Sequence, residues 1–148
     1  MVVISEVSVR SDELLTNLLA IWESSVRASH DFLSEQEILE IKKFVPAAIR
    51  GVQHLVVAAD EGELLGFMGV DGSKLEMMFL SPDHFAKGIG RKLMQFAFDN
   101  YAVNTLDVNE ANPAARGFYE HVGFEVVSRS EQDAQGNPYP ILSMRLVK

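Results

Sequence analysis

The sequence predicts an α+β fold in which a mixed, strongly twisted sheet of about seven strands carries helices on both faces. Three observations predict it. The chain has 148 residues, 47% of them hydrophobic and 23% charged, which is the composition of one ordinary globular domain over residues 1–148. Runs with the two-residue period of a strand alternate with runs of helical period. Their order, β-α-α-β-β-β-α-β-α-β-β, is typical of a sheet covered on both sides.

The first third of the chain predicts one strand and two helices. Residues 2–9 alternate apolar and polar side chains as a strand does. Ser11 and Asp12 offer N-cap chemistry for an amphipathic helix that runs to about Arg27. Ser34, with Glu37 three residues on, is a capping-box pattern, and it predicts a second helix that ends near 49–51.

The middle of the chain predicts a three-strand antiparallel meander. The β-rich runs HLVVAA, LLGFMGV and KLEMMFL are joined by the turn sequences at 60–62 and 71–73. After residues 81–83, a glycine-rich loop at 86–90 runs directly into a helix that reaches about Tyr101. Strand, glycine loop and helix are therefore consecutive.

The last third predicts a strand, a helix and a final hairpin. TLDVN at 105–109 has the pattern of a short strand. Asn112 as N-cap and Pro113 at the first helical position begin a helix, which stops at Gly123. FEVVSRS and YPILSMRL, separated by the turn residues 133–138, close the chain as a hairpin.

Charge and composition exclude several function classes. The 13 basic and 21 acidic residues give a net charge of −8, which argues against nucleic acid or an anionic membrane as partner and favours a cationic substrate. Without cysteine there is no disulfide scaffold, no thiolate nucleophile and no Cys-based metal site, and His54, His84 and His121 lack ligand spacing, so no metal is expected. The N-terminus has no signal-peptide pattern and no window reaches 18 apolar residues, so a cytoplasmic protein is expected.

The glycine loop has the features of a phosphate cradle. A glycine turn at a helix N-terminus aims unpaired backbone N–H groups outward, and the helix dipole adds positive charge there. Lys87, Arg91 and Lys92 make this neighbourhood basic in an acidic chain. A Walker loop is excluded because no hydroxyl follows Gly90, and a dinucleotide fingerprint because Leu93 stands where its third glycine would be.

A combination of motifs is more specific than the loop alone. Residues 80–82 (LSP) end a strand, 87–93 (KGIGRKL) open a helix, and 112–124 read NPAARGFYEHVGF. This combination, and the order of elements, resembles the GNAT superfamily of acyl-CoA-dependent N-acyltransferases over essentially the whole chain. Residues 28–34 (ASHDFLS) and 136–144 (GNPYPILSM) are similar to the YjaB-type subgroup of bacterial GNAT proteins.

The resemblance implies a substrate pair and a binding site. Acetyl-CoA would be the cosubstrate, and its acetyl group would pass by direct attack in a ternary complex to a primary amine, either of a protein (lysine or N-terminus) or of a small molecule. CoA would lie where the sheet splays between the strand ending at Leu80 and the strand at 105–109, with pantetheine on the strand backbone and pyrophosphate on the loop amides. Asn112 would hydrogen-bond the pantetheine arm, assisted by Asn109. The implied cofactor-binding residues are Met78, Phe79, Leu80, Phe85, Ala86, Lys87, Gly88, Ile89, Gly90, Arg91, Asn109, Asn112 and Tyr119.

Tyr119 and Glu76 are the first candidates for proton transfer. The resemblance places the Tyr119 hydroxyl at the thioester sulfur, where a phenol with a pKa of about 10 matches a departing alkyl thiolate as general acid; packing on its helix is the alternative. Glu76, which shares a face with Met78 and Leu80 if the strand is regular, is a candidate base or a partner in a cross-strand salt bridge. A bulge near Phe79 is expected to free a backbone donor for the oxyanion.

The acceptor side is less specific. His30 and Asp31 lie in the loop where GNAT acceptor pockets are built, and His30 is a second candidate base, with helix capping and a core-satisfied ring as alternatives. Phe32 and Tyr139 are expected to line the acceptor site unless they belong to the core. The acceptor itself, and whether the protein is a monomer or a homodimer, cannot be read from the sequence.

The loop also departs from the family pattern. Phe85 and Ala86 replace its usual Arg or Gln followed by Gly, which predicts weaker or altered CoA affinity. Two other functions therefore stay open: a non-catalytic acyl-CoA-binding or regulatory module, and a partner-binding protein that uses the fold without CoA.

Overall fold

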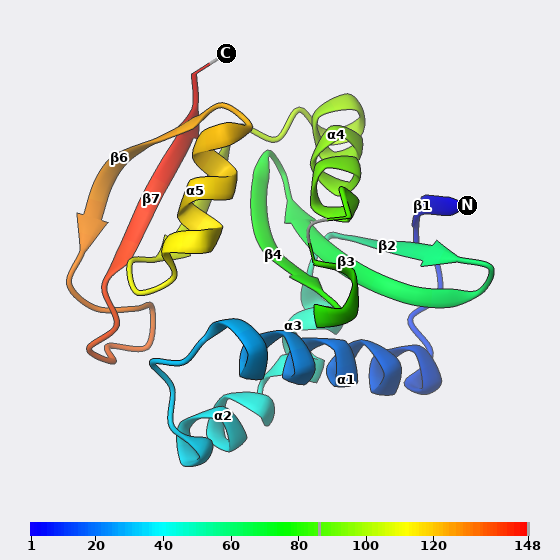
Figure 1. Cartoon of the computed structure of the whole chain (residues 1–148), viewed down its shortest axis with the longest axis horizontal. Helices are drawn as coiled ribbons and strands as arrows, with labels where there is room; N and C mark the ends of the chain where they lie inside the picture. The colour runs from blue at the N-terminus through cyan, green and yellow to red at the C-terminus, as the bar shows by residue number, and fades with distance from the viewer. Residues whose placement is uncertain (86, 148) are drawn as a thin grey trace.

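A computed structural model gives the fold and describes residues 1–85 and 87–147. In this part of the chain the strands form one seven-stranded sheet with the spatial order β1-β2-β3-β4-β5-β7-β6 (Figure 1). The strands are β1 (Val2–Glu6), β2 (His54–Asp60), β3 (Glu63–Asp71), β4 (Lys74–Leu80), β5 (Thr105–Asn109), β6 (Phe124–Ser130) and β7 (Ile141–Leu146), and the helices are α1 (Asp12–Ser29), α2 (Glu35–Lys42), α3 (Val45–Gly51), α4 (Ile89–Tyr101), α5 (Pro113–His121) and the short 3₁₀ helix η1 (Pro82–His84). β4 and β5 are parallel and the other neighbours antiparallel, so the predicted mixed α+β sheet is confirmed.

The sheet separates two hydrophobic clusters. Val56 and Met68 pack with α4 and Tyr119 on one face, which we call the α4 face, whereas Leu55 and Phe67 pack with α1 to α3 on the other, which we call the α1 face. This alternation follows from the two-residue period of β2 and β3. The prediction of helices on both faces is therefore confirmed.

The predicted second helix is wrong in its extent, because it is two helices. α2 ends at Lys42 and α3 begins at Val45. Pro46 has no N–H to donate to the carbonyl four residues earlier, and its ring would clash with that carbonyl, so one continuous helix through Lys42 is excluded. The first strand also ends early, at Glu6: the Arg10 guanidinium donates to the carbonyls of Ile49 and Arg50 and draws the chain toward α3.

Capping interactions are present at the starts of α1, α2 and α5, as the sequence predicts, and a glycine turn precedes α4. The Ser11 side chain accepts from the Leu14 amide, and Ser34 and Glu37 form both bonds of a capping box. The Asn112 side chain caps α5 by accepting from the Ala115 amide. Gly88, with φ of 78°, is the N-cap of α4 in the left-handed region that favours glycine.

The sheet splays open at its centre. β4 and β5 pair at two positions, Lys74 with Thr105 and Leu75 with Leu106, while β5 continues to pair with β7 as far as Asn109. Beyond Leu75, the edge of β4 that faces β5 therefore has no strand partner. The predicted splay is confirmed, and we call its starting point, after Leu75 and Leu106, the vertex.

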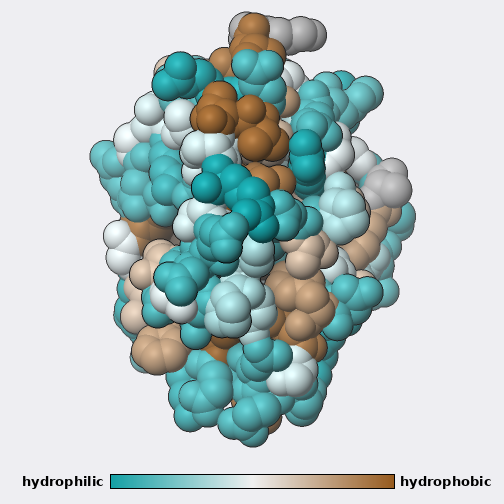
Figure 2. All heavy atoms as spheres, turned by 90° about the vertical axis from the view of Figure 1, so that its left-hand side faces the viewer, coloured by the Kyte–Doolittle hydropathy of each residue, from teal (hydrophilic) through white to brown (hydrophobic). Residues whose placement is uncertain are grey.

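The outermost strands are β1 and β6. Figure 2 looks onto the β6 side and shows a mostly hydrophilic surface, with apolar side chains gathered toward the C-terminal end. Val127 and Val147 are among the exposed apolar residues of this region. In the described ranges no helix combines the length and the apolar character needed to cross a bilayer.

The substitution Gly66→Ala tests how closely β3 approaches β4. A Cβ at Gly66 would lie 2.7 Å from Leu80 Cδ2 and 2.9 Å from the Phe79 carbonyl oxygen. Because that oxygen belongs to the backbone, the substitution is expected to lower the free energy of unfolding by about 1–3 kcal/mol, measured by denaturant titration.

Gly51→Ala is the matched control, since nothing lies within 4 Å of its Cβ position. Its effect is expected to stay within about 0.5 kcal/mol or to be slightly stabilising. Equal unfolding free energies for the two variants would contradict the close approach of the strands.

Candidate functional site

The free edge of β4 presents backbone groups to the splay. The Ser81 amide donates to the Leu65 carbonyl of β3 at 2.8 Å, and Phe79 lies opposite Phe67. Since successive amides of an antiparallel strand face alternate edges, Phe79 faces β3 while Met78 and Leu80 face the splay. The irregularity of the strand lies opposite Gly69 and Val70, so the bulge predicted near Phe79 is wrong.

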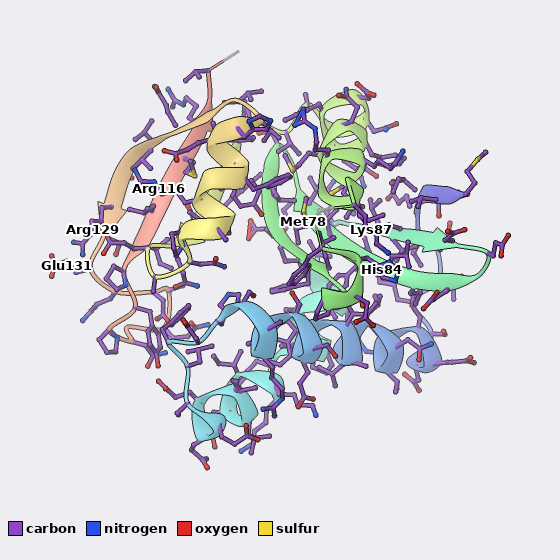
Figure 3. All side chains as sticks on the ribbon, in the orientation of Figure 1. Met78, His84, Lys87, Arg116, Arg129 and Glu131 are labelled. Atoms are coloured by element: carbon purple, nitrogen blue, oxygen red, sulfur yellow. The ribbon has the colours of Figure 1, made fainter. Side chains whose placement is uncertain are left out.

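The loop after β4 brings a helix N-terminus to the same place. Ile89, the first residue of α4, is buried, and Lys87 and Arg91 are exposed on either side of it. Figure 3 shows Lys87 and His84 at the start of α4, with Arg116 across the splay on α5. The first N–H groups of a helix have no partner within the helix, and next to two cations they suit a phosphate group. Phe85 is 39% exposed, and Ala86 lies outside the described residues.

α5 supplies Asn112 and Tyr119 from the other side of the splay. Both side chains are buried, at 8% and 9% exposure. The Tyr119 ring packs edge-on against Phe118 and Phe124, with centroid distances of 5.3 and 6.2 Å. Burial raises the pKa of Tyr119 to about 12, so its hydroxyl keeps its proton at neutral pH. Gly90 allows α4 to approach this helix, because a Cβ there would lie 3.1 Å from Phe118 Cζ.

Glu76 lies at the vertex, on the opposite face from Tyr119. It is the first residue of β4 beyond the last pair with β5, and the bulge falls between Leu75 and Met77. Leu75 packs in the α4-face cluster and Met77 in the α1-face cluster, so the alternation of side chains shifts there. The Lys74 ammonium lies 3.8 Å from Glu76, which places Glu76 with Lys74 on the α1 face. The expectation that Glu76 shares a face with Met78 and Leu80 is therefore wrong.

Asp107 joins this arrangement from β5. Its carboxylate accepts from the Lys74 ammonium at 3.0 Å and from the Ser143 hydroxyl at 2.8 Å. The salt bridge of Glu76 to Lys74 lies within β4, so it is not the cross-strand bridge that the sequence left open. The cross-strand bridge at this point joins Lys74 to Asp107 of β5. Asp107 raises the pKa of the Lys74 ammonium by hydrogen bonding, and Lys74 stays charged.

A pocket of about 500 Å³ opens beside the vertex on the α1 face. Its walls come from the loop between α1 and α2, from α2, from β5 and β7, and from the end of β6 with the loop that follows it. The lining residues are Phe32, Leu33, Ile41, Asp107, Asn109, Ser130, Gln132, Asp133, Ala134, Gln135, Tyr139, Ile141 and Ser143.

The predicted acceptor residues divide between this pocket and its surroundings. Phe32 and Tyr139 line it, 6.1 Å apart, and the His30 ring lies 5.3 Å from Phe32. His30 Nδ1 lies 2.9 Å from the Ser29 hydroxyl, and burial lowers the pKa of the imidazole, opposed by Asp31. Asp31 is exposed and does not line the pocket.

Asn109 was expected beside the cofactor, whereas Asp107 and Ser143 were not among the expected site residues. The structure puts Asn109 in the pocket on the α1 face. The alternation of TLDVN carried the signal: Leu106 and Val108 belong to the core, so Asp107 and Asn109 must face the other way.

Known proteins share both the sequence and this fold. Residues 25–147 match the family described as acetyltransferase (GNAT) domain. The peptidyl-lysine N-acetyltransferase YjaB of Salmonella typhimurium is 39% identical over 127 residues, which cover 86% of this chain and 88% of that protein.

Two solved structures show the same architecture. The solution structure of apo-form YjaB from Escherichia coli superposes with a TM-score of 0.89 at 37% identity, covering 99% of this chain and 98% of that one. A PaiA N-acetyltransferase from Thermoplasma acidophilum, solved in complex with coenzyme A, shares the fold with a TM-score of 0.72 at 19% identity, covering 98% and 99%. The expected resemblance is confirmed, and this chain belongs to the GNAT family of acetyltransferases, close to its YjaB-type members.

Proposed function

We propose that this protein transfers the acetyl group of acetyl-CoA to the ε-amine of a lysine in another protein, by direct attack within a ternary complex. The observation that carries the proposal is the splay, which has free β4 amides and the α4 N-terminus along one side and a pocket with acidic groups beside its vertex. The curated relatives, named peptidyl-lysine N-acetyltransferases, support the choice of acceptor. The curated relatives are bacterial, and we propose the bacterial cytoplasm as the place of the reaction.

The donor side uses mainly backbone groups. The Met78 and Leu80 amides and carbonyls offer the pantetheine arm the hydrogen bonds that a further strand would make. The amides at the start of α4, after Gly88, offer donors to the pyrophosphate, with Lys87 and Arg91 adding positive charge. The Asn112 carboxamide oxygen is occupied by the Ala115 amide, so its NH₂ group is the part available to the arm.

The chemistry assigns a role to each proton. A lysine arrives as an ammonium and loses a proton to Glu76, directly or through water; its nitrogen then attacks the thioester carbonyl carbon. The oxygen of the tetrahedral intermediate accepts from a β4 amide at the splay, for which Met78 replaces our sequence-based choice of Phe79. Collapse breaks the C–S bond, and the CoA thiolate accepts a hydrogen bond and finally the proton of the Tyr119 hydroxyl. The nitrogen, which became positively charged on attack, gives up its second proton through water, and this proton restores the Tyr119 phenol.

The pKa of Tyr119 limits what that phenol does in this step. At about 12 it is a weaker acid than an ordinary phenol, so it stabilises the thiolate mainly as a hydrogen-bond donor before the proton moves. Desolvation by a bound substrate raises the pKa of a thiol as well, which brings the two groups closer together.

Phe85 supports the rival functions. Its exposed ring stands where the family carries Arg or Gln, so the loop has lost one polar side-chain contact to the pyrophosphate. A non-catalytic acyl-CoA-binding module would bind acetyl-CoA and show no turnover. A partner-binding protein would not bind acetyl-CoA at all.

Gly88→Val is expected to weaken acetyl-CoA binding, measured by calorimetric titration. A β-branched residue at φ of 78° would distort the turn that aims the α4 amides, so we expect a loss of about tenfold or more in affinity. Gly136→Val, with φ of 82° in the loop between β6 and β7, imposes similar backbone strain away from the donor loop and should leave this affinity unchanged. If the Gly88→Val variant bound acetyl-CoA as tightly as the wild type does, this result would contradict the assigned phosphate site.

Tyr119→Phe is expected to lower kcat by about 100-fold, because the thiolate loses its proton donor. The rate is measured from the release of CoA and from the mass that a lysine peptide gains on acetylation. The dissociation constant of acetyl-CoA should change less than about twofold. Tyr101→Phe removes a hydroxyl from α4, where it donates to Glu6, and should leave kcat unchanged. An active Tyr119→Phe enzyme would remove the general-acid role, and absence of wild-type turnover would favour the binding module.

His30 is expected to titrate below its ordinary pKa of 6.5, because burial disfavours the imidazolium. Its contribution to stability is complete above the unfolded-state pKa and is lost as the pH falls through the lower folded-state pKa. The ring proton shifts in NMR, assigned with His30→Gln, should give a midpoint below 6.5. A midpoint at or above that value would show a solvated ring.

A further inference from the structure

Two carboxylates hold one ammonium at the vertex of the splay. Lys74 Nζ lies 3.0 Å from Asp107 Oδ2 and 3.8 Å from Glu76 Oε2. One carboxylate comes from each of the two strands that part there, Glu76 from β4 and Asp107 from β5. The protein therefore already places a primary ammonium next to its candidate base.

Asp107 also lines the pocket on the α1 face, so the same carboxylate is reached from two sides. None of the residues that line this pocket in the described part of the chain is basic. The other lining carboxylate, Asp133, accepts from the amides of Gln135 and Asn137 and so is bound within its own loop. Asp107 is the lining carboxylate placed next to Glu76.

The pair between Lys74 and Asp107 is easily exchanged. Their side chains are 41% and 42% exposed, and ion pairs of such exposure contribute little to stability. The flexible stem of Lys74 can move its head group into solvent. A second ammonium that enters through the pocket could thus replace Lys74 at little cost.

We propose that Asp107 receives the ε-ammonium of the acceptor lysine and that Lys74 occupies this position in the absence of acceptor. This inference rests on the proposed function and adds to it the residue that recognises the charged acceptor. The aliphatic stem of the acceptor would lie along Phe32 and Tyr139, and Glu76 would take the proton from the ammonium once it is held.

The inference predicts a separation of KM from kcat. Asp107 stabilises the charged acceptor, which must lose its charge before it attacks, so this contact acts on the ground state. Removal of the carboxylate should raise KM for the acceptor without lowering kcat. Removal of Lys74 should lower the same KM, because an internal competitor is lost.

Steady-state kinetics with an unstructured peptide that contains one lysine test these signs. Asp107→Asn should raise KM for the peptide roughly two- to fivefold, the worth of one partly exposed ion pair, with kcat not reduced and KM for acetyl-CoA unchanged. Lys74→Met should lower KM for the peptide. Asp107→Asn should still raise it in the Lys74→Met background, which shows that Asp107 acts on the acceptor rather than through Lys74.

A binding measurement separates this inference from the proposed function. With CoA present, Asp107→Asn should weaken the binding of the lysine peptide. It should leave the binding of the Nε-acetyl-lysine peptide unchanged, because only the unacetylated lysine is a cation. Asp99→Asn, on α4 and bonded to Gln95, makes the same charge change elsewhere and should affect neither peptide. Wild-type turnover with no effect of Asp107→Asn overturns the inference alone. A wild type that neither binds nor acetylates a lysine peptide overturns the proposed function and, with it, this inference.

Discussion

The pairing of β4 with β5 stops after two residue pairs, and the rest of the site depends on this interruption. Because β5 continues to pair with β7, the two strands diverge and leave the Met78 and Leu80 amides without a strand partner. A ligand with amide groups of its own can form hydrogen bonds with these free amides, and no existing hydrogen bond has to break. The glycine turn then places the α4 N-terminus at the end of the same edge, so the free strand edge and the helix start together form the proposed donor site.

The bulge beside the vertex sets the positions of the two proton-transfer candidates. A regular strand would direct Glu76 to the α4 face, where Tyr119 is buried among apolar rings. The shift of alternation after Leu75 directs it to the α1 face, where Asp107 and the pocket lie. The proposed acid and base therefore lie on opposite faces of the sheet, so that each would approach a thioester in the splay from its own side, as the proposed direct transfer requires.

The sequence predicted the parts that local rules govern. Capping at Ser34 and Asn112, the glycine turn before α4 and the order of the elements along the chain follow from residues close in the chain. The split at Pro46 could have been predicted from the missing N–H. The bulge at Glu76 could not, because it depends on the register with Gly69 and Val70 in a neighbouring strand, and for the same reason the pairing of Lys74 with Asp107 across the vertex was not visible in the sequence.

The most direct test of this account is hydrogen exchange of the β4 amides, followed by NMR with and without acetyl-CoA. Because Met78 and Leu80 face the splay and Phe79 faces β3, the account predicts slow exchange at Phe79 in both states. Met78 and Leu80 should exchange fast in the free protein and become protected when acetyl-CoA binds. Protection of Met78 and Leu80 before acetyl-CoA is added, or acetyl-CoA binding that leaves both amides in fast exchange, would contradict a donor site in the splay.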